Sequence, residues 1–242
     1  MHKRHQTLLA VILCFALFLF FLALKFPYAE AFRRTLQRVQ KPDGLEISVQ
    51  KVEHHFPLSF ELQGVTIVLA ELGGRQIAAD RLLLKVHAVQ LLHKKLDVAF
   101  ELLRPRFDSV YLERKLAGTL SLDLDQLTGL LRMESKNNRV AGLQLYGVDL
   151  PEIRFDMAVA EIGFAKDKTL IHGLQMIGSD LSGSLSGQVD RGYLNVAVSI
   201  EPDSKILSSN QGLLGQLVQP FAFADDISFR IRGPVSRPVI SY

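Results

Sequence analysis

The alternation of apolar and polar residues constrains the fold of this chain more than any other feature. It begins at 45–50, where Leu, Ile and Val alternate with Glu, Ser and Gln, and it repeats at 58–62. A period of two places every second side chain on one face of an extended strand. The same pattern predicts strands at 65–69, 82–86, 96–102, 107–112, 116–124, 139–146, 152–164 with a break, 170–177, 180–189, 193–200 and 227–232.

Roughly a dozen closely spaced strands predict a mainly β fold, either an extended antiparallel groove or a sandwich-like domain. The chain has no alternation of strands with long helices, which argues against a Rossmann or barrel enzyme. Gly64 interrupts the alternation, and the apolar positions resume after it on the opposite parity. This change predicts a bulge or a sharp bend at Gly64.

Helical signals are confined to short segments. Apolar residues recur at helical spacing over 29–39, with three arginines on other faces, which predicts an amphipathic helix. The spacing of Leu127, Leu130 and Leu131 predicts a short helix over 125–133. A clearer apolar stripe predicts a helix over 204–218, which ends before Pro220.

Seventeen consecutive apolar residues occupy 8–24, between Thr7 and Lys25. Such a helix is roughly 25 Å long and approaches the thickness of a bilayer core, so we expect an uncleaved membrane anchor. A cleaved signal peptide is the alternative, because 29–31 reads Ala-Glu-Ala, which is a small-x-small cleavage site. A buried core helix is a third interpretation.

The anchor suggests three divisions of the chain. Residues 1–25 form a cytoplasmic tip and transmembrane anchor, 26–44 an amphipathic stalk, and 45–242 a β-rich domain. Counting basic residues on either side of the anchor favours a cytoplasmic domain, whereas large trailing domains cross a membrane largely regardless of charge. We expect a single-pass inner-membrane protein with the bulk of the chain in the periplasm.

The formal net charge of +3 comes from the N-terminus alone. Lys3, Arg4 and Lys25 are the basic residues of the first 25, and without them 25 basic residues balance 25 acidic ones. A neutral body has no excess positive field for phosphate, so we expect no nucleic-acid partner. The single cysteine, Cys14, lies inside the apolar run and excludes an intramolecular disulfide.

Motifs that carry catalysis or metal binding are missing from the sequence. None of the seven histidines has a metal-ligand spacing on a helix, and His54 and His55 point to opposite faces of a strand. Asp123 and Asp125 share a strand face and suit a cation, although solvent-facing alternation explains them equally well. The GSLSG run at 183–187 lacks the serine of a nucleophile elbow, and its glycines favour close approach of a neighbouring strand. We expect no enzyme, no catalytic or metal site and no cofactor.

Three segments carry a family resemblance: FPLSFELQGVTIVL at 56–69, GSDLSGSLSGQVDRGYLNVAVSIEPDSKIL at 178–207 and ISFRIRGPVSRPVI at 227–240. They resemble the type II secretion system protein N family, in which a Leu-x-Gly/Asn-Val step joins two strands and a Gly-rich strand pair comes late. Gly233-Pro234 stands where a Gly-Thr pair is more typical.

The resemblance implies an inner-membrane accessory component of the pathway that exports folded proteins through the outer membrane. Its partners are then the inner membrane and other type II secretion system proteins, and it acts as a periplasmic scaffold. The family also looks like AsmA-like proteins, whose open β-grooves are associated with lipid transport. A periplasmic groove that binds lipid acyl chains is therefore the alternative function.

Overall fold

The computed structural model describes residues 27–39, 45–55, 58–69, 74–87, 90, 93–145, 148–149, 152–166, 168–179, 181–202, 227–235, 237 and 239–241. The anchor expected at 8–24 and the helix expected at 204–218 lie outside these residues. Among the residues that are described, no helix has both the length and the apolar character needed to cross a membrane.

The fold is mainly β, as the alternation predicts. One helix, α2 (Tyr28–Val39), precedes the strands. The strands are β1 (Leu45–His55), β2 (Ser59–Leu69), β3 (Arg75–Val86), β4 (Lys95–Leu103), β5 (Arg106–Phe107), β6 (Val110–Leu112), β7 (Lys115–Asp123), β8 (Thr128–Ala141), β9 (Gln144–Leu145), β10 (Val148–Asp149), β11 (Ile153–Ala165), β12 (Lys168–Ile177), β13 (Leu181–Asp190), β14 (Tyr193–Pro202), β15 (Ile227–Pro234) and β16 (Val239–Ser241).

All of the described strands except β9 and β10 form one antiparallel sheet with a meander order. The path through the sheet is β1-β2-β3-β4-β7-β8-β11-β12-β13-β14-β15-β16, so each main strand pairs with the next one along the chain. The short hairpin of β5 and β6 lies off this path, and β5 pairs with the same strand, β3, that pairs with β4. Arg191 and Gly192 both have positive φ between β13 and β14, the backbone of a tight two-residue hairpin turn.

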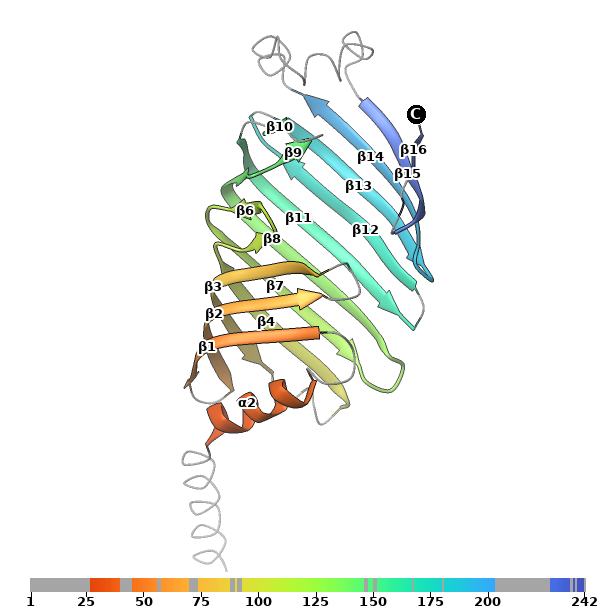
Figure 1. The fold of residues 1–242 in the computed structure, drawn as a ribbon. Coiled ribbons are helices and arrows are strands. Elements are labelled where there is room, and N and C mark those ends of the chain that lie inside the picture. The colour runs from red at the N-terminus through yellow and green to blue at the C-terminus, as the bar shows by residue number, and fades with distance from the viewer. Residues whose placement is uncertain are drawn as a thin grey trace, which may run out of the picture.

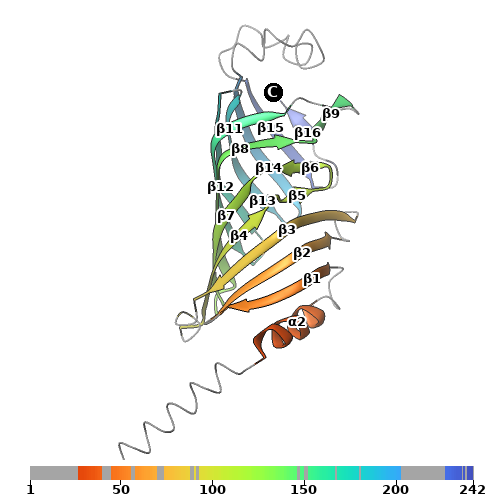
Figure 2. The same ribbon diagram turned by 90° about the vertical axis from the view of Figure 1, so that its left-hand side faces the viewer.

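The sheet is a single curved layer (Figures 1 and 2). Strands β1–β3 pass in front of β4 and β7 in Figure 1, and β8 to β15 continue the wall behind and to the right. A sandwich is not formed by the described strands, because the second sheet among them is only the two-stranded pair β9 and β10. Helix α2 lies beside β1 at one end of the sheet.

The sequence predicts a bulge or a sharp bend at Gly64, and the structure shows a local interruption of the pairing there without the extra residue of a bulge. Gly64 has φ +60° and is left out of the pairing, and so are Gln50 on β1 and Asp80 on β3. The register is unchanged on either side, because each strand leaves out one residue at the same row. Leu62 and Val65 are both nearly fully buried, which confirms that the apolar parity changes across Gly64.

The amphipathic helix expected at 29–39 is confirmed as α2, but the helix expected at 125–133 is wrong. Residues 128–133 belong to strand β8, and Leu127 lies in the preceding turn with φ +51° and 65% of its surface exposed. The side chain of Asp123 accepts hydrogen bonds from the backbone N–H groups of Asp125 (3.0 Å) and Gln126 (2.9 Å). These bonds close a turn and start the next strand instead of a helix.

Candidate functional site

Cross-strand pairing joins the apolar residues of successive strands into continuous rows. One row contains one residue from each of β2, β3, β4, β7, β8 and β11 to β15: Phe60, Leu84, Phe100, Gly118, Met133, Ala160, Leu174, Leu185, Val198 and Phe229. A second row on the same side runs from β3 to β15: Val86, Val98, Leu120, Leu131, Ile162, Ile171, Gly187, Val196 and Ile231. We call these two rows the apolar face.

The row that flanks the Phe60 row, on the side away from the second apolar row, points to the other side of the sheet and is mostly polar. The neighbouring residues that pair across the strands are Glu53, Glu61, Leu83, Glu101, Ala117, Glu134, Val159, Gln175, Ser184, Ser199 and Ser228. Ion pairs such as Arg132–Glu161 at 2.9 Å lie on this side, which we call the polar face. The sheet therefore separates apolar and polar side chains along nearly its whole length.

The first residues of α2 cover the β1–β2 end of the apolar face. The ring of Phe32 stacks on Phe60 with centroids 4.6 Å apart, and Tyr28 stacks on His54 at 4.5 Å. His54 pairs with Phe60 across the strands, and their rings are 5.2 Å apart. Phe60 is consequently only 6% exposed.

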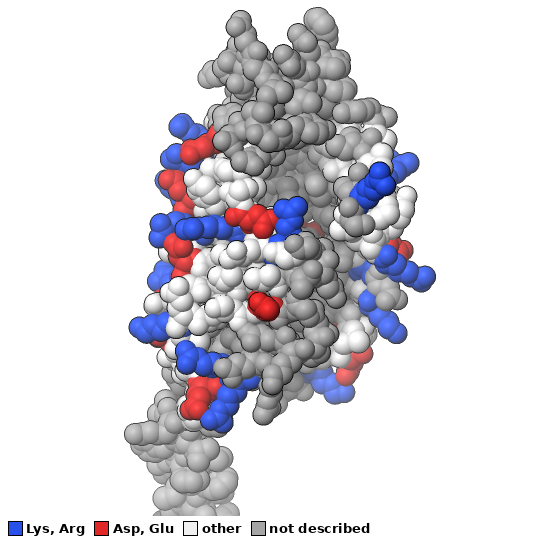
Figure 3. Space-filling model, viewed as in Figure 1, with Lys and Arg blue, Asp and Glu red and all other residues white. Residues whose placement is uncertain are grey.

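Farther along, the apolar face is unevenly covered. Leu174 is 39% exposed, and Met133, Leu185 and Phe229 are half-buried, whereas Ala160 and Val196 are nearly fully buried. Figure 3 shows Lys, Arg, Asp and Glu mainly along the two sides of the molecule, with mostly uncharged or undescribed residues between them. The pairing places the two apolar rows on the side of the sheet opposite ion pairs such as Arg132–Glu161.

One cluster on the polar face has ligand atoms that a metal ion could use. Glu53, His55 and Glu61 place one such atom each within 4.8 Å of one another. Cations already pair with both carboxylates: Lys51 contacts Glu53, and Arg81 lies 3.5 Å from Glu61. The hydrogen bond and charge of Lys51 lower the pKa of Glu53. The cluster is therefore better described as an ion-pair network than as a metal centre.

This cluster is not evident from the sequence alone, because Glu61 comes from a different strand from Glu53 and His55. Only the pairing of Glu53 with Glu61 brings the groups together. The expectation that His54 and His55 point to opposite faces is confirmed, since His54 contacts the rings under α2 while His55 lies 3.7 Å from Glu61.

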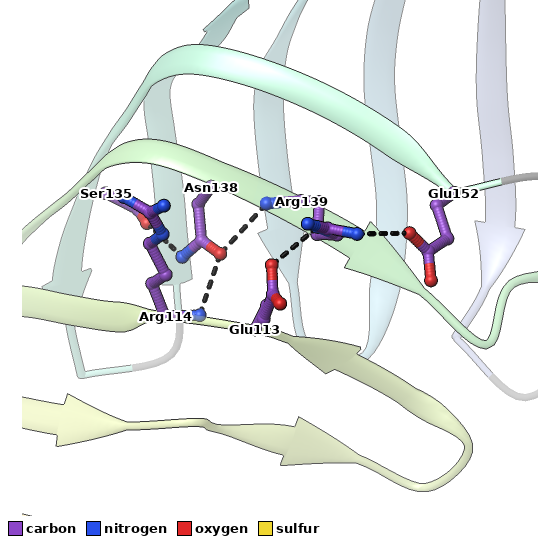
Figure 4. Close-up of polar contacts among 6 residues, drawn as sticks. All are labelled: Glu113, Arg114, Ser135, Asn138, Arg139 and Glu152. Carbon is purple, nitrogen blue, oxygen red and sulfur yellow. Dashed lines mark hydrogen bonds and ion pairs between the residues drawn. The ribbon is translucent and has the colours of Figure 1, made fainter.

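A second polar cluster fills the interruption between β6 and β7 (Figure 4). Asn138 Oδ1 accepts hydrogen bonds from the backbone N–H groups of Arg114 (2.8 Å) and Arg139 (2.9 Å), and Asn138 Nδ2 donates to Ser135 Oγ at 2.9 Å. Both Asn138 (4%) and Ser135 (3%) are buried, and Ser135 donates to the carbonyl of Lys115. These contacts satisfy backbone groups that a regular ladder would pair, which is a structural role.

Arg139 connects this cluster to two acidic residues. Its guanidinium lies 2.9 Å from Glu152 and 2.5 Å from Glu113 (Figure 4). The hydrogen bond to Glu152 and the charge of Glu113 raise the pKa of Arg139. An arginine held between two carboxylates stays charged and joins the ends of β6, β8 and β11, so it too is structural.

The other residues singled out from the sequence are accounted for by the fold. Asp123 and Asp125 do not converge on one cation position: Asp123 caps the turn, and Asp125 pairs with Lys94 at 3.1 Å. The 183–187 run lies in β13, and a Cβ on Gly187 would overlap the carbonyl oxygen of Asn195. The expectation that these glycines permit close approach of a neighbouring strand is confirmed.

Comparison with known proteins gives no relative: no protein-family model, no curated protein and no solved structure matches the chain.

Proposed function

We propose that the β-rich domain binds lipid acyl chains on its apolar face. The observation that carries this proposal is the unbroken cross-strand row from Phe60 to Phe229, of which α2 covers one end. Apolar surface left in contact with water is unfavourable by about 25 cal/mol per Å², so a surface of this kind favours an apolar occupant. Hydrocarbon fits it because the face offers area and few polar groups to set orientation.

The dimensions of the row suit a long chain. Neighbouring strands lie about 4.8 Å apart, so a row that crosses ten strands runs for roughly 43 Å. That length exceeds the roughly 30 Å of a whole bilayer hydrocarbon core. Each methylene that leaves water contributes about 0.8 kcal/mol, so even partial coverage of the row by one acyl chain is favourable.

The proposed setting is the periplasmic side of the bacterial inner membrane. The apolar run at 8–24 serves as the anchor, and the basic face of α2 follows it directly. Fusion of a reporter to the C-terminus tests this setting. Activity of a periplasm-dependent reporter is the expected result, and activity of a cytoplasm-dependent reporter would contradict it.

Lipid binding is tested by native mass spectrometry and lipid extraction of the purified full-length chain. The apolar face is probed with Leu174→Asp, and Val159→Asp is a matched control because Val159 is 38% exposed on the polar face. We expect Leu174→Asp to lower the amount of bound lipid several-fold and Val159→Asp to leave it unchanged. A lipid-free wild type, or an equal loss in both variants, would overturn the proposal.

A second proposed function is that of an accessory scaffold in the type II secretion system. It is supported by the sequence resemblance, and two of the resembling segments contain the strand pairs β13–β14 and β15–β16. Within the segment at 56–69, residues Ser59–Leu69 form one strand, whereas the family pattern has two. Affinity purification of the anchored chain should recover other secretion subunits. Normal export of folded proteins after deletion, together with no such partner, would refute it.

A further inference from the structure

The polar face changes character at its C-terminal end. Several side chains on this face of β13 to β16 are small: Ser186, Ala197 and Ser241 lie in one row with Arg230. Ser184, Ser199 and Ser228 form the row beside it. A hollow of about 630 Å³ lies over these serines, and Arg230 and Arg232 are among its lining residues.

The small residues explain the hollow. The side chains of the serines and of Ala197 are short and form the bottom of the hollow. The side chains of the two arginines on β15 are much longer and form part of its wall. Arg230 and Arg232 are two residues apart on the same strand, so their side chains leave the sheet on the same side. Both are exposed, and none of the side chains lining the hollow is acidic.

The charge of this arginine pair is not balanced by the described part of the chain. Elsewhere on the sheet, Arg75 lies 2.6 Å from Asp108 and Arg132 lies 2.9 Å from Glu161. The ion pairs formed within the described residues include neither Arg230 nor Arg232. Two neighbouring guanidinium groups without a carboxylate repel each other, and an anion between them relieves that repulsion.

We propose that Arg230 and Arg232, beside the floor of small residues, bind a phosphate group. Guanidinium groups present forked N–H donors that match phosphate oxygens. Arg230 and Arg232 leave the sheet on the side opposite the apolar face, although Val198 and Phe229 of that face are also among the residues that line the hollow. The phosphate group belongs to either a lipid headgroup or a small soluble phosphate compound.

Isothermal titration of the full-length chain in detergent tests the site, with inorganic phosphate and glycerophosphoglycerol as the two probes. Preference for the diester indicates a lipid headgroup as the source, and preference for inorganic phosphate indicates a soluble phosphate. Either preference supports the site. We expect the double variant Arg230→Gln/Arg232→Gln to weaken binding of the preferred probe about tenfold or more.

The matched control is Lys85→Gln/Lys95→Gln, which removes the same charge from exposed positions on β3 and β4 that form no ion pair within the described residues. We expect the control to bind the probe as the wild type does. A further variant, Arg230→Lys/Arg232→Lys, keeps the charge but loses the forked donors, and should bind with intermediate affinity. Equal losses in the glutamine variant and the control, or no binding of either probe to the wild type, would overturn the proposal. Unchanged circular dichroism shows that each variant is folded.

Discussion

At the β2 end of the apolar face, Phe60 is 6% exposed and lies against Phe32 of α2, whereas Leu174 on β12 in the same row is 39% exposed. Both positions carry large apolar side chains in alternating strands, and both belong to one unbroken row. The stacking of Phe32 on Phe60 accounts for the burial at the β2 end, and alternation within the strands does not distinguish the two positions. A single sheet buries its apolar side only where another element packs on it, so alternation predicts the face but not its cover.

The largest expected difference between the two ends is in the free energy of unfolding that is lost when a leucine is replaced by alanine. Leu62→Ala removes a side chain that is 2% exposed at the covered end, and should lower the free energy of unfolding by about 2–5 kcal/mol. Leu174→Ala at the less covered end should lower it by about 1 kcal/mol or less, because little new cavity is formed. Denaturant midpoints at unchanged m-value measure both. Equal losses would show that the two ends are equally buried in solution.

Between the two ends, Gly118 probes how closely the strands of the face are packed. A Cβ at this position would overlap the carbonyl oxygen of Arg132 and lie 2.6 Å from the ring of Phe100. Gly118→Ala should therefore cost about 1–3 kcal/mol. Gly173→Ala is the control, because an added Cβ there meets nothing within 4 Å. If both variants have the same melting temperature, the ring of Phe100 does not pack against Gly118 of β7.

The packing of α2 on the apolar face is tested by Phe32→Ala. Loss of the stacked pair with Phe60 should cost about 1–2 kcal/mol and increase the binding of a dye that detects exposed apolar surface. Arg33→Ala, at an exposed position on the same helix, is the matched control. A variant that stays as stable as the control and binds no more dye would show that α2 does not protect this end.

The smallest expected effect is an acid sensitivity confined to the strands nearer the covered end. Asp108 accepts a hydrogen bond from the backbone N–H of Gln76 at 2.9 Å and one from Arg75 at 2.6 Å, and these bonds lower its pKa below the ordinary 3.8. A carboxylate with a lowered pKa stabilises the folded state fully above its ordinary pKa, and the stabilisation disappears as the pH falls through the folded value.

Hydrogen exchange, corrected for intrinsic rates, should therefore show weaker protection around β3 and β5 near pH 3 than at pH 7. The β13–β14 amides should change less, and Asp108→Asn should remove the difference between the two pH values. An equal loss of protection in both regions would mean that the hydrogen bond from Gln76 to Asp108 does not specifically stabilise β3 and β5.

Most of the strands could be predicted from alternation, because each strand places apolar residues on one side and polar residues on the other. The alignment of those strands could not, since register depends on turn geometry and on bulges. Glu53 and Glu61 show the limit, because nothing local indicates that they are opposite each other. The 107–112 segment was predicted as one strand but turns at Asp108, whose φ is +52°. Helical spacing at 125–133 was misleading because three leucines in a short window also fit a turn followed by a strand.

The exposure of the apolar face could not be predicted from the sequence either. Alternation predicts that one face is apolar, and glycines such as Gly187 indicate close strand approach, but neither indicates whether a second layer covers the face. The hollow beside Arg230 was missed for another reason. Its serines come from separate strands, and they become neighbours only through the pairing of β13, β14 and β15.

The meander order has a consequence for how the chain acquires its structure. Because each main strand pairs with the next one in sequence, most contacts close short loops, and such contacts form quickly even in all-β proteins. Strands can then be added one after another onto a growing edge, much as repeats are added in a solenoid. A chain whose strands emerge on the far side of a membrane in sequence order could therefore assemble its sheet in the order of emergence, before the last strand arrives.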